Sequence, residues 1–327
     1  MTHLLRSALF ACFLTVIGLG LTSADEGPKS PKIGVIFGSN PSTAKPYDDA
    51  FRDGLRRLGY ADGKNITLLP RYAQGDVARF PALLTELIAE QVDVLVIANT
   101  AVFAAKRATR TIPIVVPSMG ASPVEDGIVA SIARPGGNVT GGCNPSAEQG
   151  GKVMQMTKEL LPDLKRVGLL YEDANPEFPK WANGMRELAA SSGLSMQIYG
   201  ARDMNEIKAA FARMNNDRIQ ALILWASPLM LLHRPAILEL AAHKIPLIAE
   251  GREYAQGGAL LTVNADYFEM WRRGAAYVDK ILKGANPGDL PVEMPNKLEI
   301  RINMRAAKDF GVTIPEAIFL QADEIIK

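Results

Sequence analysis

The chain has 327 residues, with 36 basic and 35 acidic side chains and a formal net charge of +1. Because the two signs are well mixed along the sequence, we expect no nucleic-acid partner. Beyond the N-terminus, no apolar run approaches the roughly 20 residues that a membrane helix needs.

The first 24 residues have the layout of a secretory signal peptide. Arg6 precedes an apolar run over residues 8–21, and the small residues Thr22-Ser23-Ala24 follow it. We expect cleavage near Ala24 and a periplasmic location for the mature protein.

The chain contains two cysteines. Cys12 follows Leu9-Phe10-Ala11, which resembles a lipoprotein cleavage site, but the apolar run lies after this cysteine and not before it. Removal of the leader would leave Cys143 as the only thiol, so we expect no intramolecular disulfide.

The first half of the mature chain alternates short β-branched runs with amphipathic stretches, the pattern of βαβ units and a parallel sheet. The expected strands are Lys32–Phe37, Asn65–Pro70, Val92–Ala98 and Ile112–Pro117, and the expected helices are Tyr47–Leu58 and Arg79–Glu90.

The second half repeats this order, with matching strands about 130 positions apart. KIGVIF corresponds to RVGLLY, and TIPIVVPSM corresponds to KIPLIAEGR. The expected strands are Arg166–Tyr171, Ser195–Tyr199, Ala221–Trp225 and Ile245–Ala249, and the expected helices are Lys180–Ser191 and Met204–Asn215. The repeat predicts two similar α/β lobes, each a parallel sheet flanked by helices, joined by a hinge with a ligand cleft between them. A single large doubly wound sheet is the alternative.

The C-terminal part is expected to be shared between the lobes. A helix over Tyr267–Leu282 is predicted to return to lobe one, whereas the final segment Ala317–Lys327 is predicted to belong to lobe two. Lobe one then comprises residues 32–142 plus about 265–290, and lobe two residues 143–264 plus about 291–327. The ends of the two repeats, at Gly141-Gly142 and Val263-Asn264, are the expected bending points.

A ligand is expected in the cleft, because open parallel sheets bind ligands outside the carboxyl ends of their strands. Ser, Thr and Asn side chains there can hydrogen-bond a polar head group, Thr100 at a helix start could help to hold an anion, and aromatic rings could stack on the ligand. The predicted ligand-binding residues are Ser39, Asn40, Asn99, Thr100, Ser122, Tyr171, Asn175, Trp225, Ser227, Glu250 and Arg252. Helix capping for the polar residues, core packing for the aromatic ones and a salt bridge at the cleft rim for Arg252 are the alternatives.

Catalytic signatures are missing from the sequence. There is no GxSxG, no GxxxxGK, no GxGxxG after the first strand, and the three histidines show no metal-ligand spacing. We therefore expect neither an enzyme nor a cofactor or metal.

Four stretches carry a family resemblance: FRDGLRRLGYADGKNITL, VASIARPGGNVTG, YVDKILKGANPGDLPVE and INMRAAKDFGVTIPEAIFLQADEII. Through them the chain resembles the ABC-transporter substrate-binding proteins of the group with tryptophan- and tyrosine-binding members. The resemblance implies a type I periplasmic-binding fold, a ligand in the interlobe cleft, hinge closure, a membrane permease as partner and a monomer. Similar proteins often carry Asp-Pro where this chain has Ser122-Pro123.

The sequence thus predicts the periplasmic binding component of an ABC uptake transporter, with an amino acid or another small carboxylate as ligand. A sugar or nucleobase would use the same side-chain types. An extracytoplasmic ligand sensor that feeds a separate signalling partner is the alternative function.

Overall fold

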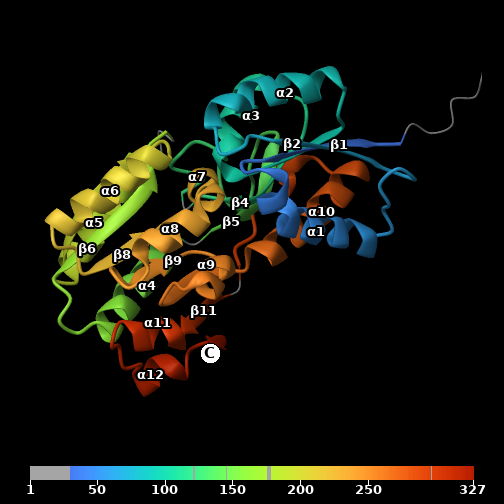
Figure 1. The fold of residues 1–327 in the computed structure, drawn as a ribbon. Coiled ribbons are helices and arrows are strands. Elements are labelled where there is room, and N and C mark those ends of the chain that lie inside the picture. The colour runs from blue at the N-terminus through green and yellow to red at the C-terminus, as the bar shows by residue number, and fades with distance from the viewer. Residues whose placement is uncertain (1–29, 121, 145, 175–177, 296) are drawn as a thin grey trace, which may run out of the picture.

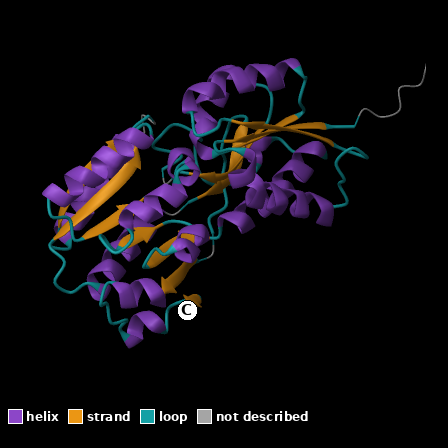
Figure 2. Cartoon of the chain, in the orientation of Figure 1, coloured by secondary structure: helices purple, strands orange, loops and turns teal. Residues whose placement is uncertain are grey.

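Two separate β-sheets divide the chain into two lobes (Figures 1 and 2). The computed structural model describes residues 30–327 except 121, 145, 175–177 and 296. The two sheets confirm the prediction of two α/β lobes and exclude the alternative of one large sheet. The predicted signal peptide and Asn175 lie outside the described residues.

The first sheet is parallel throughout and has five strands in the order β2-β1-β3-β4-β5. Its strands are β1 Lys32–Phe37, β2 Thr67–Tyr72, β3 Val94–Ile97, β4 Ile114–Met119 and β5 Val139–Cys143. β1, β3 and β4 are buried on both faces, as expected for a sheet with helices on each side.

Helices cover both faces of this sheet. α2 (Phe80–Ala89) and α3 (Val102–Ala108) bury their apolar sides on one face, while α1 (Pro41–Arg57) and α10 (Tyr267–Leu282) pack on the other. α1 begins six residues before the predicted start, because Asn40 caps it by accepting from the Thr43 backbone N–H at 2.9 Å. Two 3-10 turns, η1 Val77–Arg79 and η2 Asn99–Ala101, precede α2 and α3.

The second sheet has seven strands in the order β12-β11-β10-β9-β8-β6-β7. Only the β10–β11 pair is antiparallel. The strands are β6 Arg166–Glu172, β7 Ser195–Ala201, β8 Ala221–Leu224, β9 Leu247–Ala249, β10 Leu261–Ala265, β11 Leu298–Asn303 and β12 Glu324–Ile326.

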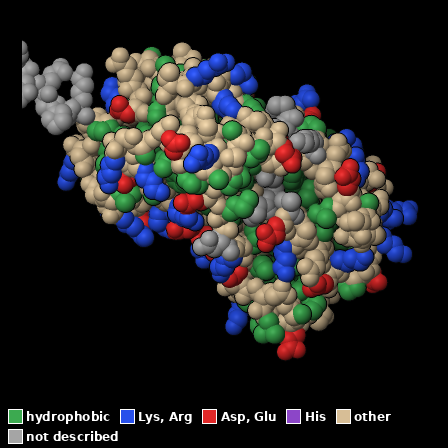
Figure 3. All heavy atoms as spheres, turned by 180° about the vertical axis from the view of Figure 1, so that it is seen from behind, with side chains coloured by type: hydrophobic (Ala, Val, Ile, Leu, Met, Phe, Trp, Pro, Cys, Tyr) green, Lys and Arg blue, Asp and Glu red, His purple; other side chains and the backbone are tan. Residues whose placement is uncertain are grey.

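The helices of this lobe form two layers. α4 and α5 share a core with one face of the sheet, and α6, α8 and α9 share a core with the other. The helices are α4 Ser146–Leu160, α5 Phe178–Ser191, α6 Met204–Asn216, α7 Pro228–Leu232, α8 Arg234–Ala241, α9 Arg252–Gly257, α11 Met304–Asp309 and α12 Glu316–Phe319. On the face of the molecule shown in Figure 3, basic and acidic side chains are interspersed.

The chain passes between the lobes three times: from β5 to α4, from β10 to α10, and after the 3-10 turn η3 (Pro287–Asp289) to β11. The third segment runs beside β5, where Gly142 pairs with Glu293. The predicted bending points lie inside β5 and β10, one to two residues before these strands end. At Gly141 a Cβ would lie 2.0 Å from the Val116 carbonyl oxygen, so this glycine serves close strand packing.

The contact between α1 and α10 depends on a glycine. A Cβ on Gly54 would lie 2.3 Å from the carbonyl oxygen of Arg272, which is a backbone atom and cannot turn away. Gly54→Ala should therefore destabilise the protein by about 1–3 kcal/mol, seen as a lower urea midpoint. Gly151→Ala in α4 is the control, because no atom lies within 4 Å of its added Cβ. It should stabilise by about 0.5–1 kcal/mol. Equal midpoints for the two variants would contradict the packing described here.

Candidate ligand-binding cleft

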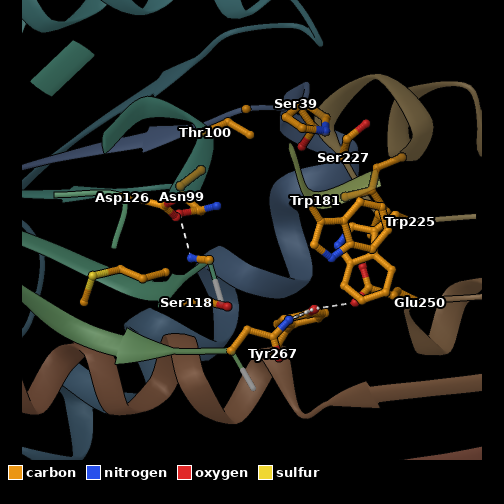
Figure 4. Close-up of a pocket in the computed structure, with 18 of the residues that line it drawn as sticks. Ser39, Asn99, Thr100, Ser118, Asp126, Trp181, Trp225, Ser227, Glu250 and Tyr267 are labelled. Atoms are coloured by element: carbon orange, nitrogen blue, oxygen red, sulfur yellow. Dashed lines mark hydrogen bonds between the residues drawn. The ribbon is translucent and has the colours of Figure 1, made fainter. Parts of the chain in front are cut away.

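A cavity of about 740 Å³ lies between the two lobes (Figure 4). It is lined by the carboxyl-end loops of strands from both sheets, and by residues of α1, α5 and α10. Ligand sites for small molecules usually measure about 300–1,000 Å³. The cavity therefore has the size and the place in the fold that a small-molecule site needs.

Polar groups of lobe one line one side of the cavity. Asn99 is held in place, because its Oδ1 accepts from the Gly120 backbone N–H at 2.9 Å. The hydroxyl oxygen of Thr100 is buried and has no hydrogen-bond partner in the described part of the chain. Ser39 and Ser118 add further hydroxyl groups to the lining. These four side chains offer hydrogen-bond donors without a formal charge.

Aromatic rings make up much of the rest of the lining. Trp181 and Trp225 come from lobe two, with ring centroids 4.2 Å apart. From the lobe-one side, Phe37 and Trp271 stack with centroids 5.0 Å apart. All three tryptophans of the chain thus line the cavity.

The α5 helix presents a single face to the cavity. Trp181, Gly184, Met185 and Leu188 all line it, and their spacing of three, four and seven residues puts them on one side of a helix. This apolar stripe extends the aromatic wall of lobe two.

Glu250 is the most deeply buried charged group in the lining, with 2% of its surface exposed. Its carboxylate accepts hydrogen bonds from the Ala226 backbone N–H at 3.0 Å, from the Tyr267 hydroxyl at 3.0 Å and from the Gln149 side-chain amide. Burial raises the pKa of Glu250 to about 7, although these three donors act in the opposite direction.

Asn144 extends this network. Its side-chain nitrogen donates to the Tyr267 hydroxyl at 2.8 Å, and that hydroxyl donates to Glu250 (Figure 4). The side-chain oxygen of Asn144 is buried and without a partner among the described residues. Asn144 directly follows β5, and Tyr267 is the first residue of α10. The network therefore lies beside two of the three connections between the lobes.

The charges of the lining are all of one sign. Asp126 and Glu250 are acidic, whereas none of the described lining residues is a lysine, arginine or histidine. Across the described ranges, no group of three or more His, Cys, Asp or Glu side chains is placed to hold a metal ion.

The structure places most of the predicted ligand-binding residues in the cavity wall. Those that line it are Ser39, Asn99, Thr100, Ser122, Trp225, Ser227 and Glu250. Ser227 also caps α7, accepting from the Met230 backbone N–H at 3.2 Å. Contact of these residues with a ligand stays a prediction.

Three predicted residues lie outside the cavity wall. Asn40 uses its side chain to cap α1. The Tyr171 hydroxyl donates to Asp173 at 2.9 Å, and its ring is 8% exposed in the sheet. Arg252 turns away on α9 and pairs with Glu324 at 3.0 Å. For these three residues the structure shows the alternatives of the sequence analysis: helix capping, core packing and a salt bridge. The sequence could not decide between the two roles, because each depends on how the local backbone directs a side chain.

The sequence analysis also missed lining residues that helices or the lobe connections supply. They are Tyr47, Asn144, Trp181, Tyr267 and Trp271. Asp126, in a turn between β4 and β5, was missed as well. The apolar stripe of α5 is the one signal that could have indicated its cavity-facing side.

Comparison with known proteins gives a consistent result. The family model described as ABC transporter substrate binding protein matches residues 32–326. A tyrosine-binding protein of Clostridioides difficile is 27% identical over 281 residues, which is 85% of this chain and 80% of the relative.

Solved structures share the fold. A Streptococcus pneumoniae ABC domain in complex with L-Trp has a TM-score of 0.82 and 25% identity, covering 91% of this chain and 100% of the other. A substrate-binding protein from Clostridium difficile, in a ligand-free, open form, has a TM-score of 0.64 and 24% identity, covering 91% and 99%.

The pKa of Glu250 sets a pH dependence of stability. The unfolded chain releases this proton at an ordinary carboxyl pKa near 4.3, so between about pH 4.5 and 7 the folded protein binds more protons than the unfolded chain. The free energy of unfolding should therefore fall as pH rises from about 4.5 through 7, by about 3 kcal/mol from this group. Tyr47, Tyr254 and Tyr267 face Glu250, but burial holds their pKa values well above this range, so they stay neutral.

Glu250→Gln removes the titrating group. Urea unfolding at pH 5, 6, 7 and 8 should give the variant a flatter dependence on pH than the unsubstituted protein. Glu239→Gln, at an exposed position of α8, is the control and should keep the original slope. If the free energy of unfolding depends on pH in the same way in Glu250→Gln and in the unsubstituted protein, Glu250 ionises at an ordinary pKa and the prediction is wrong.

Proposed function

The chain belongs to the ABC transporter substrate-binding protein family, and from that premise we propose that it captures an aromatic amino acid in the periplasm for delivery to a membrane permease. It is a binding protein and not an enzyme. The observation that carries the choice of ligand is the cavity lining, in which all three tryptophans of the chain meet polar groups.

The aromatic wall suits an aromatic side chain. Offset or edge-to-face contacts between rings contribute about 0.5–1.5 kcal/mol beyond the burial of their area. An indole or phenol ring that lies against Trp181 and Trp225 would gain the free energy of these ring contacts and that of burying its apolar area. The names of two similar proteins, one tyrosine-binding and one in complex with L-Trp, support the same class of ligand.

The polar side of lobe one suits the ligand carboxylate. Because no cation lines the described part of the cavity, the carboxylate would be held by neutral donors: the Asn99 amide and the hydroxyls of Thr100 and Ser118. Thr100 has a buried hydroxyl whose hydrogen-bonding capacity is unused within the protein. A buried polar group without a partner is costly, so a ligand that supplies the partner gains affinity.

The lobes are close together in this structure. A Cβ on Gly38 of lobe one would lie 2.4 Å from Pro228 of lobe two, and one on Gly75 would lie 2.8 Å from Leu232. In the proposed mechanism this arrangement is the closed form, which a ligand favours by touching both lobes at once.

Closure changes the surface that a permease would meet. The three interlobe connections are the hinge, and lobe one comprises residues 32–142 with about 265–290, including α10. The rest of the mature chain forms lobe two. The closed surface is what the permease recognises.

None of the helices in the described ranges is both long and apolar enough to cross a membrane. The leader up to Ala24 would export the chain before it meets the permease.

Intrinsic fluorescence tests the proposed ligand, because every tryptophan of the chain lies at the cavity. Purified residues 25–327 are titrated with L-tyrosine, L-phenylalanine, L-leucine and glucose, and L-tryptophan is tested by thermal shift. An aromatic amino acid at a hundred times its Kd should stabilise the fold by about 2.7 kcal/mol. A response to leucine or glucose alone would contradict the proposal.

A variant pair locates the binding. Trp181→Ala removes a ring from the cavity wall and should weaken aromatic binding by about tenfold or more. Phe319→Ala removes a ring that is 47% exposed on α12, and should leave the affinity unchanged. Equal affinities for both variants would place the ligand elsewhere.

A further inference from the structure

Glu250 is a buried carboxylate without a counterion. It forms no ion pair in the described part of the chain, and its three hydrogen-bond donors are neutral groups. Removing a carboxylate from water is expensive when no cation accompanies it. In its ionised form this carboxylate borders a cavity lined by aromatic rings, so a cation placed in the cavity would be attracted by both and would favour the ionised form.

Asn144 supplies a second, independent observation. Its side chain is 5% exposed and lines the cavity, and its nitrogen is already used to donate to Tyr267. Its oxygen is a buried acceptor without a partner among the described residues. This oxygen lacks a hydrogen-bond donor, which a ligand could supply.

An ammonium group meets both needs. It carries three N–H donors and a positive charge. A sugar hydroxyl could donate to Asn144, but it would leave the charge of Glu250 uncompensated.

We propose that Asn144, Tyr267 and Glu250 form a subsite for the ammonium group of the ligand. Glu250 provides the charge, the Asn144 oxygen accepts one N–H, and Tyr267 is a positioning residue that joins the two. This inference rests on the proposed function, since it assigns one end of the same ligand.

The subsite also connects ligand binding to the hinge. Glu250 and Gln149 belong to lobe two, Asn144 precedes the connection to α4, and Tyr267 follows the connection to α10. An ammonium group that contacts Asn144 and Glu250 would link lobe two to the β5–α4 connection directly, and to the β10–α10 connection through Tyr267. A ligand without an amine would not form this link.

Asp126 is the rival carboxylate. It belongs to lobe one, and in Figure 4 it lies with Asn99 on the opposite side of the cavity from Glu250, Trp181 and Trp225. Glu250 is held rigidly by three donors, and such preorganisation lowers the entropic cost of binding. The assignment therefore falls on Glu250.

The test compares L-tryptophan with indole-3-propionate, which lacks only the amine, by isothermal titration calorimetry. The unsubstituted protein should bind L-tryptophan at least about thirtyfold more tightly. Glu250→Gln should lose most of this preference while it still binds indole-3-propionate, which shows that the cleft is intact. Tyr267→Phe keeps the ring and should lose about tenfold of the preference. Glu239→Gln is the control and should keep the full preference.

Two results overturn the subsite while leaving the aromatic ligand in place: equal binding of both indoles, or an unchanged preference in Glu250→Gln. Loss of the preference in Asp126→Asn, with no loss in Glu250→Gln, moves the ammonium group to the other wall and also overturns it. If neither indole binds the unsubstituted protein and L-tyrosine and L-phenylalanine fail as well, the proposed aromatic ligand is wrong. L-leucine is then compared with 4-methylpentanoate, which lacks only the amine. The subsite requires that the unsubstituted protein prefer L-leucine and that Glu250→Gln lose this preference. Equal binding of the two compounds to the unsubstituted protein overturns the subsite.

Discussion

The return of α10 to the first lobe is the constraint on which both the fold and the cleft depend. This helix leaves the second sheet after β10 and buries Trp271, Tyr277 and Val278 against α1 and the first sheet. Its docking fixes the first turn of the helix at the junction of the lobes. Two residues of that end, Tyr267 and Trp271, then reach the cavity. A chain in which α10 stayed with the second lobe would lack these contacts.

The cleft divides its chemistry between the lobes. Lobe one offers neutral donors at its strand ends, whereas lobe two offers a tryptophan pair and a buried carboxylate. Neither lobe alone surrounds a ligand, so an elongated molecule with polar groups and an aromatic body gains most when the lobes meet. Within the described residues, Thr100 and Asn144 each have a buried polar atom without a hydrogen-bond partner, and Glu250 has no counterion. Such buried groups cost free energy when the lobes are together. They explain why a ligand would be needed to hold the lobes together.

The sequence predicted the lobes well because the internal repeat encodes them strand by strand. It also located Ser39, Asn99 and Thr100, since strand ends in a parallel sheet meet at a common edge. It missed α4, whose paired glycines interrupt the apolar pattern, and it did not foresee the antiparallel pairing of β11. Tyr47, Trp181 and Asn144 could not be found in the same way, because their exposure to the cavity depends on how helices and connections are arranged between lobes. Arg252 shows the converse: it is two residues from Glu250 in sequence, yet it pairs with Glu324, 72 positions away.

A structure of residues 25–327 determined with bound L-tryptophan or L-tyrosine tests the central claim most directly. The account predicts a single ligand between the lobes, its ring against Trp181 and Trp225 and its amine within hydrogen-bonding distance of Asn144 or Glu250. A ligand bound outside this cavity, or one whose carboxylate faces Glu250, would contradict it.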